Sequence, residues 1–258
     1  MSANSDSKIN NPIKPVKLSD DTVFKFSCHK GLSCFNKCCN DIEIFLSPYD
    51  ILRLRNALQI SSDDFLSLYT EATILLKTNL PFVKLRLKED GDCPFVKDEG
   101  CSVYDNRPLT CRYYPLGFGA FKNREDGDGE FYYLIEEDFC NGRQENEEWT
   151  VRKWRDSQGI DVYNDLNKEW FDIILTKKLN FAQNEPDEKT ANMYLTAAYN
   201  IDGFRRFVFE SRFLSQFDVP AETVEKIRNN DEELMVFAHK WLKVALFGEA
   251  TVKLKNTG

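Results

Sequence analysis

The sequence predicts an α+β protein, in which a small cysteine-rich module of β-hairpins and loops packs with a mainly helical C-terminal part. Strand-like patterns occur before residue 142, for example over residues 83–88, where apolar and basic side chains alternate. After Glu145 the apolar residues recur at helical spacing, and the last cysteine is Cys140. We therefore expect three regions: a disordered tail over residues 1–22, a cysteine-cluster domain over residues 23–142 and a helical region over residues 143–258.

The N-terminal part is predicted to hold two short extended segments. Residues 1–15 are polar and rich in Asn and Ser, which is typical of disorder. Residues 23–26 alternate in polarity and predict a short strand, and residues 42–46 predict a second extended segment. The first four cysteines fall between these segments, so we expect them in a loop.

Two helix start signals follow. Residues 47–50, Ser-Pro-Tyr-Asp, combine an N-cap residue, a proline at N1 and an acidic residue at N3. The helix that begins there carries Ile51, Leu54 and Leu58 on one face. Residues 61–64, Ser-Ser-Asp-Asp, repeat the start signal and predict a second helix.

The middle of the chain is predicted to form a strand and two hairpins. The half-buried strand at residues 83–87 leads through a turn to Cys93, and a turn at residues 97–100 would place Cys93 opposite Cys101. The second hairpin has arms at residues 118–122 and 130–135, joined by the glycine- and acid-rich residues 123–129.

The remainder of the chain is predicted to be helical. The clearest signal lies near the C-terminus, where the apolar positions follow the i, i+3, i+4, i+7 template at Leu234, Phe237, Ala238, Trp241, Leu242, Ala245 and Leu246. We interpret these apolar and aromatic stripes as core packing.

Eight cysteines are the most informative feature of the sequence. Seven of them lie between Cys28 and Cys111, and the full set is Cys28, Cys34, Cys38, Cys39, Cys93, Cys101, Cys111 and Cys140. Thiolates are soft ligands that suit zinc, copper(I) and iron–sulfur clusters. Clustered thiols in a reducing compartment therefore indicate a metal site.

Disulfide bonds and buried free thiols are the alternatives to a metal site. Disulfides need an oxidising compartment, and the adjacent Cys38–Cys39 pair is awkward to bridge. Buried free thiols are common, but seven would not gather by chance beside turn residues.

The type of metal centre is indicated by the spacing of the cysteines. Zinc favours closely spaced pairs, such as Cys34 with Cys38 or Cys39. An iron–sulfur cluster draws four ligands from several loops and tolerates irregular spacing. The sequence therefore favours an iron–sulfur cluster of the 4Fe-4S type, with zinc as the alternative.

The pattern resembles a known family. The first four cysteines are followed by Cys93-Pro94-Phe95, then by residues 100–115 with the order Gly-Cys-Ser-Val-Tyr, Arg-Pro, Cys-Arg and Tyr-Pro, and then by Cys140. This set is similar to the YkgJ-type cysteine-cluster family, a zinc- or iron-chelating domain, and to the cysteine region of flagellin lysine N-methylases. The resemblance implies a metal or iron–sulfur centre held by the eight cysteines. The spacing x5 then x3 is looser than the C-x2-C-x2-CC form of the family, so the ligands that share one metal stay open.

Two arginines and two histidines are further candidate site residues. Arg107 and Arg112 flank Cys111 and are candidates for binding a cofactor or an anionic substrate, or for holding a loop by an ion pair. His29 follows Cys28 and is a weaker candidate ligand. His239 lies between lysines in the C-terminal helix and is predicted to be on the surface.

Composition excludes several classes of function. The net charge is −8, and no basic stripe with interleaved aromatic residues is present, which argues against nucleic acid as a partner. The first residues lack the pattern of a signal peptide, and no apolar run approaches the about 18 to 20 residues that span a bilayer, so we expect a cytoplasmic protein without a membrane partner. A protein or small-molecule partner is expected but not specified by the sequence.

Three functions are consistent with these observations. The first is an iron–sulfur protein with a redox or cluster-dependent modifying role. The second is a zinc-stabilised binding domain without catalysis. The third, suggested only by the similarity to flagellin methylases, is protein lysine N-methylation. No Ser/His/Asp set or nucleotide-binding glycine motif is found, and whether the protein is an enzyme stays open.

Overall fold

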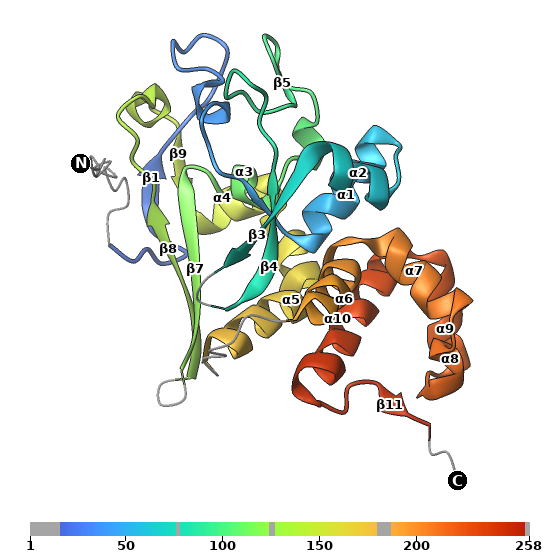
Figure 1. Ribbon diagram of the computed structural model, residues 1–258. Helices are drawn as coiled ribbons and strands as arrows, with labels where there is room; N and C mark the ends of the chain where they lie inside the picture. The colour runs from blue at the N-terminus through green and yellow to red at the C-terminus, as the bar shows by residue number, and fades with distance from the viewer. Residues whose placement is uncertain (1–15, 76–77, 124–126, 180–186, 256–258) are drawn as a thin grey trace, which may run out of the picture.

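The computed structural model describes residues 16–75, 78–123, 127–179 and 187–255. It has the predicted α+β fold, with small antiparallel sheets in the N-terminal half and helices in the C-terminal half. Figure 1 shows the strands and the N-terminal loops on one side of the molecule and the C-terminal helices on the other. Within the described residues, no helix is both long enough and apolar enough to cross a membrane.

A three-stranded antiparallel sheet lies at the centre. Its strand order is β2 (Phe45–Leu46), β4 (Leu80–Leu85) and β3 (Thr70–Leu75). The predicted strand at 83–87 is confirmed in part, because β4 begins earlier and is buried on both faces except at Lys84. Trp170 packs against Phe82 of β4, so a helix covers the face that alternation had assigned to solvent. The β3 strand was not predicted.

Two hairpins follow along the chain, as expected. The first pairs β5 (Val96–Lys97) with β6 (Gly100–Cys101), and Val96 rather than Cys93 is opposite Cys101. The second pairs β7 (Leu116–Asn123) with β8 (Gly127–Leu134), and is longer than the predicted arms at 118–122 and 130–135. Part of its predicted loop, residues 124–126, lies outside the described residues.

The two predicted helix starts are confirmed. Helix α1 (Pro48–Leu58) begins with a capping box, because Asp50 N donates to Ser47 Oγ (3.2 Å) and Ser47 N donates to Asp50 Oδ2 (2.7 Å). Helix α2 (Ser62–Tyr69) is capped by Ser61, whose hydroxyl accepts from Asp64 N (3.0 Å). Short stretches of helix complete this half: η1 (Lys37–Cys39), η2 (Tyr104–Asn106), α3 (Leu109–Tyr113) and η3 (Asn141–Gln144).

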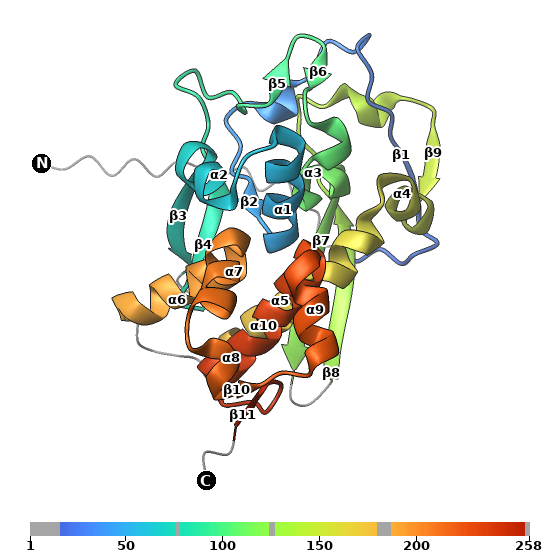
Figure 2. The same cartoon turned by 90° about the vertical axis from the view of Figure 1, so that its right-hand side faces the viewer.

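The C-terminal half is helical, as predicted. Its helices are α4 (Val151–Gln158), α5 (Ile160–Leu179), α6 (Glu188–Tyr199), α7 (Ile201–Glu210), α8 (Phe213–Gln216), α9 (Ala221–Asn229) and α10 (Asp231–Phe247). Strands β10 (Phe217–Asp218) and β11 (Lys253–Leu254) form a small pair at the end. Figure 2 shows α10 beside α5, and its predicted apolar face is buried as far as Leu242. Ala245 and Leu246, at its end, are not buried.

The N-terminal segment joins the two halves. Strand β1 (Val23–Lys25) pairs with β9 (Glu148–Thr150), and Leu18 N donates to Tyr132 O (2.8 Å). Residues 1–15 of the predicted tail lie outside the described residues, whereas residues 18–22 bond to the body of the protein. The hydrophobic core runs from Phe24 to Val252 without a break at residue 142. The domain division at 142/143 stays a prediction.

One side chain was placed wrongly from the sequence. His239 is fully buried in α10, near the Ala198 main chain of α6. The neighbouring lysines suggested a surface position, but Lys243 is itself buried and paired with Glu169 and Asp172. Burial lowers the pKa of His239 to about 4, because the charged ring would lose its hydration.

This burial predicts a pH-dependent stability. Below pH 6.5 the unfolded chain binds a proton at His239, while the folded protein stays neutral at that ring until about pH 4. The free energy of unfolding should therefore fall by about 3 kcal/mol between these pH values through this residue alone. Urea unfolding of wild type and His239→Phe at pH 7 and pH 4 measures it. An equal loss in both proteins would contradict the assignment.

Candidate metal centre

The eight cysteines lie in loops and short elements at one end of the molecule. Figure 1 shows the loop that follows β1 beside the β5 hairpin at the top of the view, and Figure 2 shows the same neighbourhood from the side. All eight are free thiols. Four are half-buried and three are buried, whereas Cys28 is exposed.

Successive tight turns form the first cysteine loop. Phe35 N donates to Leu32 O (3.0 Å), and Lys37 N donates to Cys34 O (3.0 Å). Asn36 has a left-handed backbone, with φ of 69°, and its carbonyl accepts from Cys39 N (2.9 Å). These turns keep Cys34, Cys38 and Cys39 in one compact segment.

Main-chain hydrogen bonds join this loop to the second cysteine segment. Cys93 N donates to Cys39 O (2.8 Å), and Asp41 N donates to Gly91 O (3.0 Å). Gly91 has φ of +84°, and a Cβ atom there would lie 2.3 Å from Asp41 Oδ1, so only glycine fits. Asn36 Nδ2 adds a bond to Lys97 O (2.8 Å).

A third segment brings Cys140 to the first loop. Ser27 N donates to Gly142 O (2.9 Å), and Asn141 N donates to the sulfur of Cys34 (3.3 Å). A Cβ atom at Gly142 would lie 2.7 Å from Ser27 O, so the close approach of the two segments requires glycine here. The chain ends of the cysteine region are therefore side by side.

Asp50 links Cys111 to the body of the protein. Cys111 lies in α3, and Leu109 N at the start of α3 donates to Asp50 Oδ1 (2.7 Å). The Asp50 side chain is buried, and burial raises its pKa to about 6 in spite of the hydrogen bonds that it accepts. In the sequence, Asp50 is recognisable only as part of a helix start, because nothing local signals its bond to Leu109.

The thiols form two neighbouring groups. Cys28 is exposed as a whole residue, but the protein atoms around its sulfur partly desolvate the thiol, which raises its pKa to about 11, with further contributions from the nearby Cys38, Cys34 and Cys140. These four sulfur atoms belong to the first loop and to the segment that joins it.

The second group surrounds Cys111. Burial is the largest cause that raises the pKa of Cys111, followed by Cys93, Asp50, Cys101 and Cys38. The pKa of Cys93 is also raised by burial and then by Cys101. These thiols come from the β5–β6 hairpin, the segment before it and α3.

Cys38 and Cys39 stand between the two groups. The Cys39 thiol hydrogen-bonds to Cys38, which lowers the pKa of Cys38 and raises that of Cys39. Cys111 and Cys93 contribute to the raised pKa of Cys39. Cys38 contributes to the raised pKa of Cys28 and also to that of Cys101. The adjacent pair thus reaches both groups.

The side chains do not converge on a single point. Among the residues that the structure describes, no group of three or more His, Cys, Asp and Glu side chains is gathered as around a metal ion. Their main chains are adjacent, but their sulfur atoms are not arranged as ligands.

The two arginines have different surroundings. Arg112 donates to three carbonyl oxygens, those of Arg107 (3.1 Å), Gln158 (2.6 Å) and Asp105 (2.6 Å), so it holds loops together. Arg107 bonds to Tyr104 O (2.7 Å) and stacks on the Tyr104 ring (3.9 Å). Its guanidinium also acts to lower the pKa of Cys101, against the larger effect of burial, which raises it. Arg107 therefore affects the pKa of a thiol, whereas the hydrogen bonds of Arg112 go to main-chain carbonyl groups.

His29 turns toward the solvent beside the first group. Its Nε2 lies 3.6 Å from Glu145, and its Nδ1 accepts from Gly31 N (3.2 Å). Both ring nitrogens thus have neighbours other than the thiols.

The fold and the site define a protein whose α+β body carries a cysteine-rich loop module. Residues 27–141 match the CxxCxxCC family model, described as a "putative zinc- or iron-chelating domain". This segment, somewhat less than half of the chain, therefore carries the domain of that family, and the resemblance predicted from the cysteine pattern is confirmed. The match supports metal binding by the segment. Neither the curated proteins nor the solved structures gave a match to the chain.

Because Asp50 accepts a buried hydrogen bond from Leu109 N, we expect the substitution Asp50→Asn to lower the stability of the protein strongly. Asp50→Asn should lower the free energy of unfolding by about 2 to 4 kcal/mol, because it weakens several buried charge-assisted hydrogen bonds. Asp64→Asn is the matched control, since Asp64 holds the same position in the Ser-capped α2 but is exposed. It should cost less than about 1 kcal/mol. Urea denaturation compares the variants, and equal costs would refute the role of Asp50.

Proposed function

We propose that the clustered cysteines hold iron as an iron–sulfur cluster, with four of them as the ligands of each cluster. The observation that carries the proposal is the set of hydrogen bonds that brings segments around Cys39, Cys93 and Cys140 together from distant parts of the chain. The family match of residues 27–141 supports a zinc or iron ligand set in the same region.

The chemistry of the donors fits a thiolate-bound metal. Burial and neighbouring thiols raise the pKa values of Cys28, Cys93, Cys101 and Cys111, so the thiolates are costly without a positive charge nearby. A metal cation supplies that charge and takes up deprotonated thiols. The bond from Asn141 N to the Cys34 sulfur is of the kind that tunes cluster ligands.

Binding would require the thiol side chains to turn toward a common point. The described side chains are not gathered around one position, whereas the main chains that carry them are tied by hydrogen bonds. Rotation about the Cα–Cβ bond is a small change for cysteine, because its side chain has one such torsion. The loops therefore hold the cysteine main chains close together, and metal binding would fix the final positions of the sulfur atoms.

The neighbours of each thiol suggest two centres of four ligands. One set is Cys28, Cys34, Cys38 and Cys140, and the other is Cys39, Cys93, Cys101 and Cys111. Four thiolates are what one tetrahedral zinc or one iron–sulfur cluster takes. The adjacent Cys38 and Cys39 would then serve different centres.

Zinc is the second candidate. Cys34 and Cys38 lie in one tight turn, which suits the short spacing of structural zinc sites. In that case the module would be a zinc-stabilised binding domain without catalysis. A redox or modifying role stays a prediction that follows from the metal, and lysine methylation stays one that rests only on the similarity to flagellin lysine N-methylases.

Metal analysis of anaerobically purified protein tests the proposal. We expect bound iron with inorganic sulfide and a brown colour, and Cys111→Ala should lose the metal of its centre and unfold the module, because site formation and folding are coupled. Colourless protein with stoichiometric zinc would favour the second candidate instead.

Ser102→Ala is the control for the cysteine variants, because Ser102 follows Cys101 and its side chain bonds to Phe95 O (3.0 Å) rather than to a thiol. It should keep full metal occupancy. If Cys111→Ala also keeps it, the ligand assignment is wrong.

A further inference from the structure

A polar hollow lies away from the cysteines, between α1, α2 and α7. Its volume is about 570 Å³, and it is lined by Arg55, Asn56, Gln59, Ile60, Ser61, Asp202, Arg205 and Arg206. Ile60 is the single apolar side chain in this lining. The volume is within the range of small-molecule sites, about 300 to 1,000 Å³.

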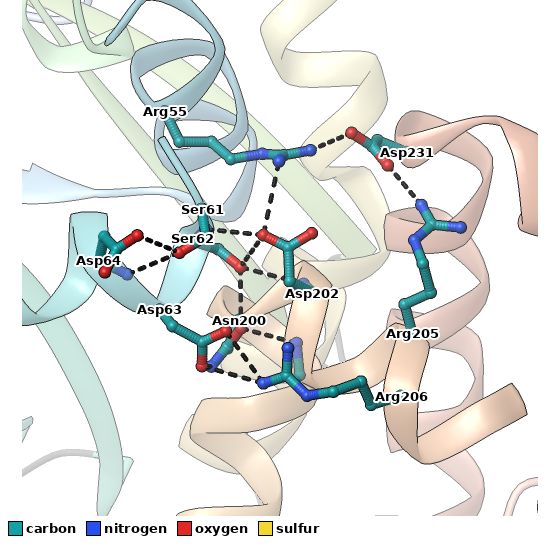
Figure 3. Close-up of polar contacts among 11 residues, drawn as sticks. Arg55, Ser61, Ser62, Asp63, Asp64, Asn200, Asp202, Arg205, Arg206 and Asp231 are labelled. Atoms are coloured by element: carbon teal, nitrogen blue, oxygen red, sulfur yellow. Dashed lines mark hydrogen bonds and ion pairs between the residues drawn. The ribbon is translucent and has the colours of Figure 1, made fainter. Parts of the chain in front are cut away.

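Three arginines in the lining are the candidate groups for binding an anion. Arg55 bonds to Asp202 (3.4 Å) and to Asp231, and Arg205 bonds to Asp231 and to Ile227 O (2.9 Å). Figure 3 shows Arg55 and Arg205 on either side of Asp231, and Arg206 beside Asp63. The carboxylates behind these guanidinium groups fix their positions, as a preorganised anion site requires.

The negative charge of the aspartates is offset by helix N-termini as well as by the arginines. Asp63, Asp202 and Asp231 each lie in the first turn of a helix, in α2, α7 and α10 respectively. Each helix N-terminus carries roughly half a positive charge, which offsets part of the aspartate charge. Asp202 Oδ2 also accepts from Ser62 N (2.7 Å) at the start of α2. Among the residues that line the hollow itself there are three arginines and one aspartate, Asp202, so the lining carries more positive than negative side chains.

Arg206 is the arginine best placed to meet a ligand. Its side chain is 52% exposed, and its Nη2 bonds to Asp63 (2.9 and 3.1 Å). Among the described residues, its Nε and Nη1 have no hydrogen-bond partner, so each has an N–H group that remains for a ligand. Each can donate a charge-assisted hydrogen bond to an oxygen of a phosphate or carboxylate group.

We propose that this hollow binds a small ligand through an anionic phosphate or carboxylate group, held by Arg206 with Arg55 and Arg205. The site is separate from the cysteines and does not depend on the metal. Gln59, Asn56 and Ser61 supply neutral polar groups that would orient the rest of the ligand.

Isothermal titration calorimetry at low ionic strength tests this with two probes, pyrophosphate and tricarballylate. At least one should bind to the purified protein, and the probe that binds identifies phosphate or carboxylate as the preferred group. Arg206→Gln should weaken that binding by about tenfold or more, because a positive charge and its charge-assisted hydrogen bonds are lost.

Arg152→Gln is the matched control. Arg152 is an exposed arginine of α4 that also faces an aspartate, with Nη2 3.5 Å from Asp20, but it does not line the hollow. Its replacement should leave binding unchanged. Asn56→Glu is a second variant that breaks no ion pair and places a negative charge at the exposed rim, so it should weaken binding as well.

If neither probe gives a heat of binding at millimolar concentration, the proposal is overturned. The arginines would then only form ion pairs that hold the helices together. Equal weakening by Arg206→Gln and Arg152→Gln would also overturn it, since that result indicates non-specific attraction of anions.

Discussion

A buried carboxylate connects the folded body to the cysteine module. Asp50 closes the start of α1 through Ser47 N (2.7 Å) and at the same time accepts from Leu109 N (2.7 Å), which begins the helix of Cys111. The cost of burying this charge is offset by these bonds and by the nearby Arg112 guanidinium, which lowers the pKa that burial raises. The module itself contains little regular structure, so its position depends on such links.

The arrangement of the thiols makes their deprotonation costly. Several of them are buried beside one another, and burial first, then the neighbouring Cys93, Asp50, Cys101 and Cys38, raise the pKa of Cys111. A bound cation would offset the cost of deprotonation, and the family match of residues 27–141 points in the same direction.

Local signals account for most of what could be predicted from the sequence. Ser47 and Ser61 marked helix starts because capping is decided within a few residues, and the C-terminal stripe marked α10 because helical spacing is local too. Strand β3 was missed, since Thr70–Leu75 lacks alternation and is extended through its pairing with β4. The burial of His239 and the bond from Leu109 to Asp50 depend on long-range packing that no local pattern encodes. For the same reason, the sequence identified the candidate ligands by type but not which thiols are neighbours.

X-ray absorption at the edge of the metal that co-purifies with the protein tests the central claim most directly. The account predicts a first shell of sulfur, and a second shell of iron if a cluster is present. A first shell of oxygen and nitrogen would contradict it, because the metal would then be bound by groups other than the cysteines.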